Sequence, residues 1–182
     1  LSVLCKHVME VKDHPVALIL TRQNVPTFDR EKYESADGAA KGAYIIADSK
    51  GKPDIIIIGT GSEVQLCLGA YEKLQKEGVN ARVVSMPCWS IYERQGQDYW
   101  EEVMPTSVKA RVSVEAGSTF GWRRYVGTHD EGGVIGVSTF GESAPIGDLW
   151  PEFGFTVKHI VDKAHEDLIM NGKKTSKKAA TK

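Results

Sequence analysis

Residues 53–66 read PDIIIIGTGSEVQL, and this stretch decides the fold. The four isoleucines from Ile55 to Ile58 predict a strand that is buried on both faces, because an uninterrupted apolar run has no side suited to water. Gly59 and Gly61 then predict a tight turn at the end of the strand. A buried strand of this kind is typical of a parallel sheet that is covered by helices on both faces.

A helix is predicted directly after the turn. Ser62, with Glu63 next to it, is expected to cap the start of this helix, and Gly78 is expected to end it. The apolar face of the helix would consist of Val64, Leu66, Cys67, Leu68, Tyr71 and Leu74. A buried strand, a glycine turn and a helix are also how many folds hold a phosphate, which makes nucleotide binding the first hypothesis to examine.

The glycine turn does not match the motifs of nucleotide-binding proteins. A dinucleotide fingerprint needs a third glycine where Val64 stands, and the next predicted strand ends in Ser85 and Met86 without an acidic residue to hold a ribose. The sequence also lacks the GKS or GKT of a P-loop. We therefore expect the two glycines to serve a strand-to-helix turn, with anion binding at the exposed amides as the alternative.

Strands and helices continue to alternate through the rest of the chain. Further buried strands are predicted at 81–86, 110–115 and 133–138, a short strand at 44–47, and a last helix at 157–170. The connections between the buried strands are long enough for crossovers, so these strands should run parallel. The expected fold class is therefore α/β, a three-layer mixed sheet of four parallel strands plus one short antiparallel edge strand, with helices on both faces.

The first part of the chain is expected to be organised differently. Residues 1–25 contain an amphipathic helix and, at 16–21, the apolar run VALILT, which predicts a strand. Residues 26–42 are polar, without a sustained apolar period, and are typical of a linker that crosses a surface. We therefore expect a domain boundary there, followed by the α/β domain at 43–170 and a basic, disordered tail at 171–182.

Composition and charge exclude several classes of protein. The chain has a formal net charge of −1, but five of its 23 basic residues lie at 171–182, which leaves an acidic body. An acidic body argues against nucleic acid as a partner, because phosphate neutralisation needs a basic face. No apolar run approaches the roughly 20 residues that span a bilayer, which argues against a membrane partner. The three cysteines form no CxxC pair, so no disulfide framework is predicted and the cytoplasm is the expected compartment.

Ligands of open α/β sheets bind at the carboxyl ends of the strands. In this chain those ends carry the residues of a speculative ligand crevice, namely Thr60, Ser62, Glu115 and Glu142. The two glutamates could serve as a general acid and base. Carboxylates that lock loops are the favoured interpretation, because no nucleophile is evident nearby, and no catalytic residue is predicted.

Other groups that could carry chemistry have simpler interpretations. The five histidines show no HExxH arrangement, so a metal site is not predicted. His129 and Asp130 could form an acid–base pair, but in a glycine-rich turn a surface hydrogen bond is the favoured interpretation. Six aromatic residues in the crossovers are expected to be mainly core, with a part of them at an oligomer contact: Trp89, Tyr92, Tyr99, Trp100, Trp122 and Tyr125.

Arg22 stands just after the predicted strand at 16–21, in the run TRQNVP. A guanidinium in this position can form a two-pronged contact with a phosphate or a carboxylate. From the residues alone, a structural ion pair is the favoured interpretation of Arg22.

Four motifs, taken together, resemble the C-terminal part of the transketolase family. They are VALILTRQNVP at 16–26, PDIIIIGTGSEVQLCLGAYEKLQKEGVNARVVSMP at 53–87, ARVSVEAG at 110–117 and STFGESAPIGDLWPEFGFT at 138–156. Their order and spacing are similar to those of that family over most of the chain. The resemblance implies that the chain begins with the last helix and strand of a pyrimidine-binding domain and continues with the whole C-terminal domain.

The resemblance also implies an activity for the parent enzyme. Transketolases transfer a two-carbon ketol unit from a ketose phosphate to an aldose phosphate in the pentose phosphate pathway, and they act as homodimers. They use thiamine diphosphate and a divalent metal, Mg or Ca. The arginine of the family's RQN motif, which binds the sugar phosphate, matches Arg22.

The catalytic motifs of the family have no counterpart in this sequence. These are the GDG motif that binds the pyrophosphate, the glutamate that activates the cofactor and the histidines of the substrate channel. We therefore expect this chain to bind no cofactor, to be inactive alone, and to contribute to the dimer and to the scaffold that it forms with the rest of the subunit. A related thiamine-diphosphate enzyme such as dihydroxyacetone synthase, or a free-standing module for anion sensing or dimerisation, are the alternatives.

Overall fold

A five-stranded sheet forms the centre of the computed structural model, which describes residues 2–128 and 133–173. The strand order is β1-β3-β2-β4-β5. The strands are β1 (Tyr44–Ala47), β2 (Ile55–Gly59), β3 (Ala81–Ser85), β4 (Arg111–Ser118) and β5 (Val134–Val137). β2 to β5 pair in parallel, whereas β1 runs antiparallel to β3 at the edge. The predicted sheet of four parallel strands and one antiparallel edge strand is confirmed.

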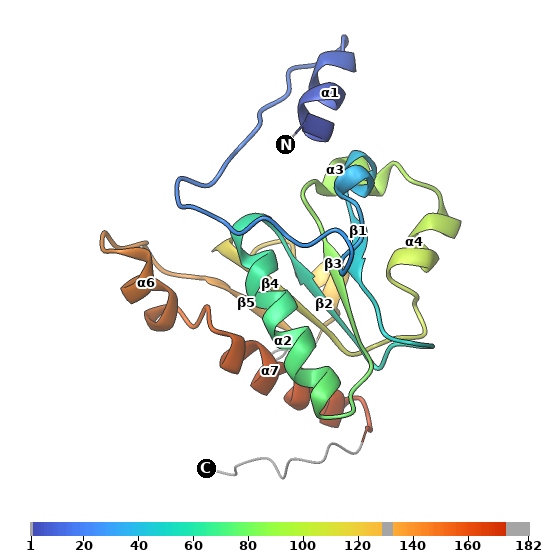
Figure 1. Ribbon diagram of the computed structural model, residues 1–182, viewed down its shortest axis with the longest axis vertical. Helices are drawn as coiled ribbons and strands as arrows, with labels where there is room; N and C mark the ends of the chain where they lie inside the picture. The colour runs from blue at the N-terminus through green and yellow to red at the C-terminus, as the bar shows by residue number, and fades with distance from the viewer. Residues whose placement is uncertain (1, 129–132, 174–182) are drawn as a thin grey trace.

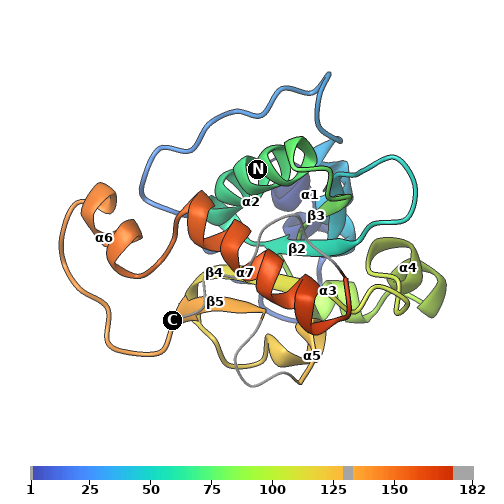
Figure 2. The same cartoon turned by 90° about the horizontal axis from the view of Figure 1, so that it is seen from below.

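Helices cover both faces of the sheet (Figure 1). α2 (Val64–Lys76) and α7 (Val157–Met170) pack together on one face. The other face is covered by α3 (Trp89–Glu93), α4 (Gln97–Val103) and α5 (Arg123–Val126). Seen from below, the sheet lies between these two helical layers (Figure 2). The predicted three-layer arrangement is therefore confirmed.

The isoleucines of β2 join the two layers. Ile55 and Ile57 belong to the core under α2 and α7, whereas Ile56 and Ile58 belong to the core on the opposite face. All four side chains are fully buried. Burying one such side chain contributes about 1.5–3 kcal/mol, so this one strand stabilises both halves of the core.

Residues 12–27 differ from the sequence-based prediction. α1 (Ser2–Glu10) forms a helix as predicted and stands away from the sheet, beside the 3-10 helix η1 (Ala36–Lys41) (Figure 1). The predicted strand at 16–21 is wrong, because these residues have no regular structure and Ile19 is 92% exposed. A strand is stabilised by pairing with neighbours in a sheet, and the described part of the chain places no strand beside this run. Its apolar residues therefore remain in contact with solvent.

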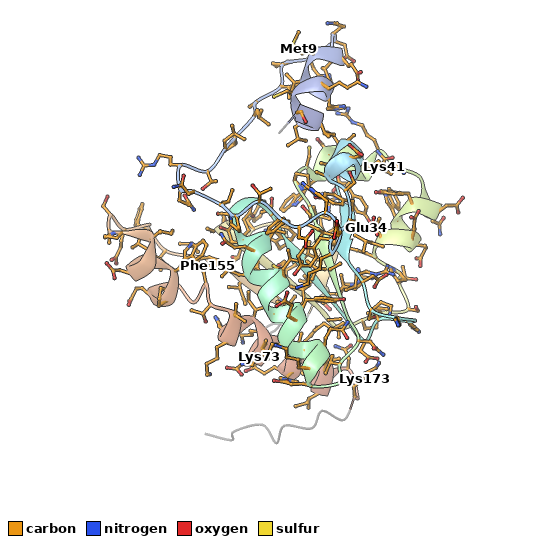
Figure 3. The ribbon with its side chains drawn as sticks, viewed as in Figure 1. Met9, Glu34, Lys41, Lys73, Phe155 and Lys173 are labelled. Atoms are coloured by element: carbon orange, nitrogen blue, oxygen red, sulfur yellow. The ribbon has the colours of Figure 1, made fainter. Side chains whose placement is uncertain are left out.

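The segment between α1 and the sheet runs over the surface, but it is held by contacts of its own. Phe28 and Tyr33 pack against the core of the α2 face. The backbone N–H of Glu34 donates to the carbonyl oxygen of Ile46 at 3.0 Å, so this segment covers part of the free edge of β1. Glu34 lies over that edge, whereas Met9 projects from α1 into solvent (Figure 3).

A further helix, α6 (Ile146–Glu152), follows β5 and was not predicted from the sequence. Its Trp150, and Phe153 just beyond it, pack against the α2 face of the core. Phe155, which is 2% exposed, faces the same core from the connection to α7 (Figure 3). None of the helices at 2–128 and 133–173 combines the length and the apolar character needed to cross a bilayer.

Gly59 is expected to tolerate no side chain. An added Cβ would lie 2.7 Å from Sγ of the buried Cys67 and 3.2 Å from Cα of Val64. We expect Gly59→Ala to lower the free energy of unfolding by about 1–3 kcal/mol, as overpacking does in a filled core. Urea denaturation followed by circular dichroism measures this change.

Gly147→Ala in α6 is the matched control, because an added Cβ there meets no atom within 4 Å. This variant should be neutral or slightly stabilising, since alanine favours a helix over glycine. Equal free energies of unfolding for the two variants would contradict the close packing of the turn.

Candidate functional site

The carboxyl ends of β2 and β3 lie level with one another, and the neighbouring strand β4 continues beyond them to Ser118. Gly59 is in register with Ser85 on β3 and with Val114 on β4. From Gly59 the chain passes through one 3-10 turn, η2 (Gly61–Glu63), directly into α2. Gly61 has a φ of +56°, which glycine adopts without steric cost. The predicted strand-to-helix turn is therefore confirmed.

Ser62 and Glu63 are buried in this turn, with exposed fractions of 8% and 4%. The Ser62 hydroxyl donates to Oε1 of Glu63 at 2.5 Å, and the backbone N–H of Ala116 on β4 donates to Oε2 of Glu63 at 3.1 Å. Both carboxylate oxygens thus accept a hydrogen bond, as a buried carboxylate requires. Glu63 therefore joins the turn after β2 to the neighbouring strand β4.

The prediction that Ser62 caps α2 is wrong. Glu63 occupies the cap position, without a side-chain bond to the helix amides. The Ser62 hydroxyl has a single proton, and it donates that proton to the Glu63 carboxylate. The serine therefore serves the turn rather than the helix end.

The Glu63 carboxylate places a fixed negative charge where α2 begins. Such a charge is favourable beside the positive end of a helix dipole. An approaching phosphate would meet this charge inside a poorly hydrated turn, where repulsion is stronger than in water. The geometry thus favours a structural turn over a phosphate site.

Burial, and after it the nearby Glu63 carboxylate, raise the pKa of the Cys67 thiol, so Cys67 stays neutral.

Gln23 brings the segment before the linker to this turn. Its Nε2 donates to Oγ of Ser62 at 3.2 Å. Gln23 is half-buried, whereas its neighbour Arg22 is exposed. The structure therefore places Arg22 one residue from a direct contact with the Gly59–Glu63 turn.

The residues of the predicted crevice lie in three places. Thr60 and Ser62 belong to the turn, whereas Glu115 on β4 accepts a hydrogen bond from the indole Nε1 of Trp122 at 2.7 Å. Glu142 is exposed, in the exposed run 138–145 that leads to α6. Glu115 thus joins β4 to the start of α5 through a side-chain contact. A ligand crevice formed by all four residues stays a prediction.

Most of the crossover aromatic residues are core, as expected. Their rings contact one another at centroid separations of 5.0–6.3 Å, and the members of the cluster are Trp89, Tyr92, Tyr99, Trp122 and Tyr125. Burial raises the pKa of Tyr92 to about 12, so its phenol stays protonated at neutral pH. Trp100 is 40% exposed and donates its indole N–H to the carbonyl of Tyr92 at 2.9 Å. An oligomer contact through these residues stays a prediction.

Sequence reasoning missed the roles of Glu63 and Gln23. The only local signal was that each is a polar residue in a motif, next to Ser62 and Arg22 respectively.

Across residues 2–128 and 133–173, no three His, Cys, Asp or Glu side chains gather closely enough to hold a metal ion. The pair His129 and Asp130, and most of the basic tail, lie outside the described residues. The turn after β2, with Ser62 and Glu63, can therefore hold a neighbouring group in place.

Comparison with known proteins supports the resemblance seen in the motifs. Residues 42–156 match the family described as the transketolase-like TK C-terminal domain. The transketolase of Aquifex aeolicus is 50% identical over 155 residues, which are 85% of this chain and 22% of that protein. Transketolase 1 of Escherichia coli is 48% identical over 167 residues, 92% of this chain and 25% of that protein. The chain thus spans about a quarter of the length of these relatives.

Solved structures of transketolases share the fold. The transketolase of Pichia stipitis in complex with sedoheptulose 7-phosphate aligns with a TM-score of 0.72 and 33% identity, covering 88% of this chain and 22% of that one. The transketolase of Leishmania mexicana aligns with a TM-score of 0.69 and 37% identity, covering 79% of this chain and 20% of that one. The chain therefore belongs to the transketolase family, and residues 42–156 form that family's C-terminal domain.

Proposed function

We propose that this chain acts as the C-terminal part of a transketolase subunit. The complete enzyme would transfer a two-carbon ketol unit from a ketose phosphate to an aldose phosphate in the pentose phosphate pathway. The observation that carries this proposal is the 50% identity to a transketolase over 85% of the chain, together with the match of residues 42–156 to the family's C-terminal domain. The Pichia stipitis transketolase to which the fold aligns was solved with a sugar phosphate, sedoheptulose 7-phosphate.

Within that enzyme, this chain would supply a packed platform and one cationic group. The platform is the five-stranded sheet with its two helical layers, and the cation is Arg22, which is exposed and free to meet a phosphate. A guanidinium suits this task because its planar fork donates two parallel hydrogen bonds to a phosphate. Arg22 is thus the group that we assign to the phosphate of the sugar.

The cofactor chemistry would come from the rest of the enzyme. Thiamine diphosphate, with a divalent metal, Mg or Ca, would supply the carbanion chemistry of ketol transfer. The residues of this chain do not fit that group, because the described part holds no carboxylate and histidine cluster for a metal and the sequence holds no GDG motif. We therefore assign cofactor binding to the preceding domains of a homodimer.

The compartment that we propose is the cytoplasm. Three cysteines, Cys5, Cys67 and Cys88, are all unpaired. Structural disulfides are rare in reducing compartments and common in oxidising ones, so unpaired thiols support this assignment.

The isolated chain of 182 residues should be inactive. We expect no ketol transfer from a ketose phosphate and no heat of binding with thiamine diphosphate and Mg²⁺ in titration calorimetry. Circular dichroism should show a folded α/β protein in the same sample, which serves as the control. Saturable cofactor binding, or turnover above that of buffer, would contradict the assignment of the chemistry to the other domains.

In the complete enzyme, Arg22→Ala should weaken the use of phosphorylated sugars. We expect a loss of about 1.5–3 kcal/mol in kcat/KM for ketose phosphates, which is the usual range for a hydrogen bond to a charged group. Part of this loss can fall on kcat, because binding energy from a remote phosphate also stabilises the transition state. Steady-state kinetics with a ketose phosphate and with an unphosphorylated ketose measure the effect. An equal loss for the two substrates would mean that Arg22 is structural.

A further inference from the structure

Within this chain, the segment that carries Arg22 makes few contacts with the C-terminal domain. From residue 12 to residue 27, all of which the structure describes, every side chain is exposed except that of Gln23. Gln23 donates from Nε2 to Oγ of Ser62, 39 residues further along the chain. The residue next to Arg22 is thus the point at which this segment is fastened to the C-terminal domain.

The anchor continues into the sheet through buried groups. The Ser62 hydroxyl donates its proton to Oε1 of Glu63 at 2.5 Å, which leaves its lone pairs to accept from Gln23. Oε2 of Glu63 accepts from the backbone N–H of Ala116 on β4, 53 residues away. The direction of each bond is therefore fixed, and the series ends on a central strand of the sheet.

We propose that Gln23, Ser62 and Glu63 are positioning residues for Arg22 in the recognition of the sugar phosphate. The inference rests on the proposed function of Arg22 and gives the C-terminal domain a part in substrate binding. Ser62 and Glu63 are buried and fixed by the turn after β2, so they form a rigid point of attachment for Gln23. The hydrogen bond of Gln23 to Ser62 restricts the position of the adjacent residue, Arg22.

A guanidinium binds phosphate well only when both of its donors face the phosphate oxygens. An arginine side chain loses conformational freedom when it binds a phosphate, and that loss weakens binding. A neighbouring residue that is already fixed reduces this loss. The positioning residues are therefore expected to change the affinity for phosphorylated substrates and to leave unphosphorylated ones unaffected.

Gln23→Met in the complete enzyme tests this inference. Methionine keeps the length of the side chain and its neutral charge but cannot donate a hydrogen bond to Ser62. We expect the ratio of kcat/KM for a ketose phosphate to kcat/KM for an unphosphorylated ketose to fall about 2- to 10-fold, the equivalent of one neutral hydrogen bond. The change should fall mainly on KM of the phosphorylated substrate. Ser62→Ala should lower the same ratio. Ser62→Thr, which keeps the hydroxyl, should leave the ratio near that of the unaltered enzyme.

Gln65→Met is the matched control. Gln65 donates from Nε2 to the backbone carbonyl of Ser62 at 3.0 Å, on the same turn but outside the series that leads to Gln23. This variant removes a bond of the same kind and should leave the substrate ratio unchanged. A fall as large as that of Gln23→Met would show a general loosening of the turn and would overturn the positioning role.

Arg22→Ala separates the two proposals. In its background, Gln23→Met should cause no further fall in the substrate ratio, because the two changes act on one contact. An additive fall would mean that Gln23 acts by another route, and the positioning role would be wrong. If Arg22→Ala lowers the ratio but Gln23→Met does not, only the positioning role fails. If Arg22→Ala itself leaves the ratio unchanged, the assignment of Arg22 to the phosphate fails.

Discussion

The buried carboxylate of Glu63 is the group on which the carboxyl edge of the sheet depends. It lies in the turn between β2 and α2, accepts one bond from Ser62 and one from the backbone of β4, and is 4% exposed. A buried carboxylate without partners would be costly, so these bonds fix the turn in one conformation. The same carboxylate carries a negative charge that would repel the phosphate of a nucleotide.

This constraint explains why a glycine turn of the kind used for phosphates serves another purpose here. The Glu63 carboxylate of the chain itself provides the negative charge beside the positive end of the α2 dipole. The hydroxyl of Ser62 is thereby turned into an acceptor, and it receives the amide of Gln23. A fold that holds cofactor phosphates in other proteins thus becomes a platform for a neighbouring segment. The scaffold role that is expected of this domain in transketolases gains a specific contact in this way.

The sheet could be predicted from the sequence because its signals are local. The isoleucines of β2 and the apolar period of α7 predict their elements, and α7 begins and ends where its pattern does. The run at 16–21 has an equally strong pattern but pairs with no strand in the part of the chain that the structure describes. α6 is only seven residues long, with Pro151 inside it. The contacts of Glu63 and Gln23 span 53 and 39 residues, so no periodicity could reveal them. Motifs could show that these residues belong to a family, but only the fold shows what they touch.

Amide hydrogen exchange at Ala116 tests the role of Glu63 most directly. In the ¹⁵N-labelled chain, the Ala116 amide should exchange slowly, because it donates to a buried carboxylate. In Glu63→Ala this amide should exchange much faster, while the amides of Ile56 to Ile58 in β2 keep their protection and show that the sheet is intact. Unchanged protection of Ala116 in a folded Glu63→Ala chain would contradict the claim that this carboxylate fastens the turn to β4.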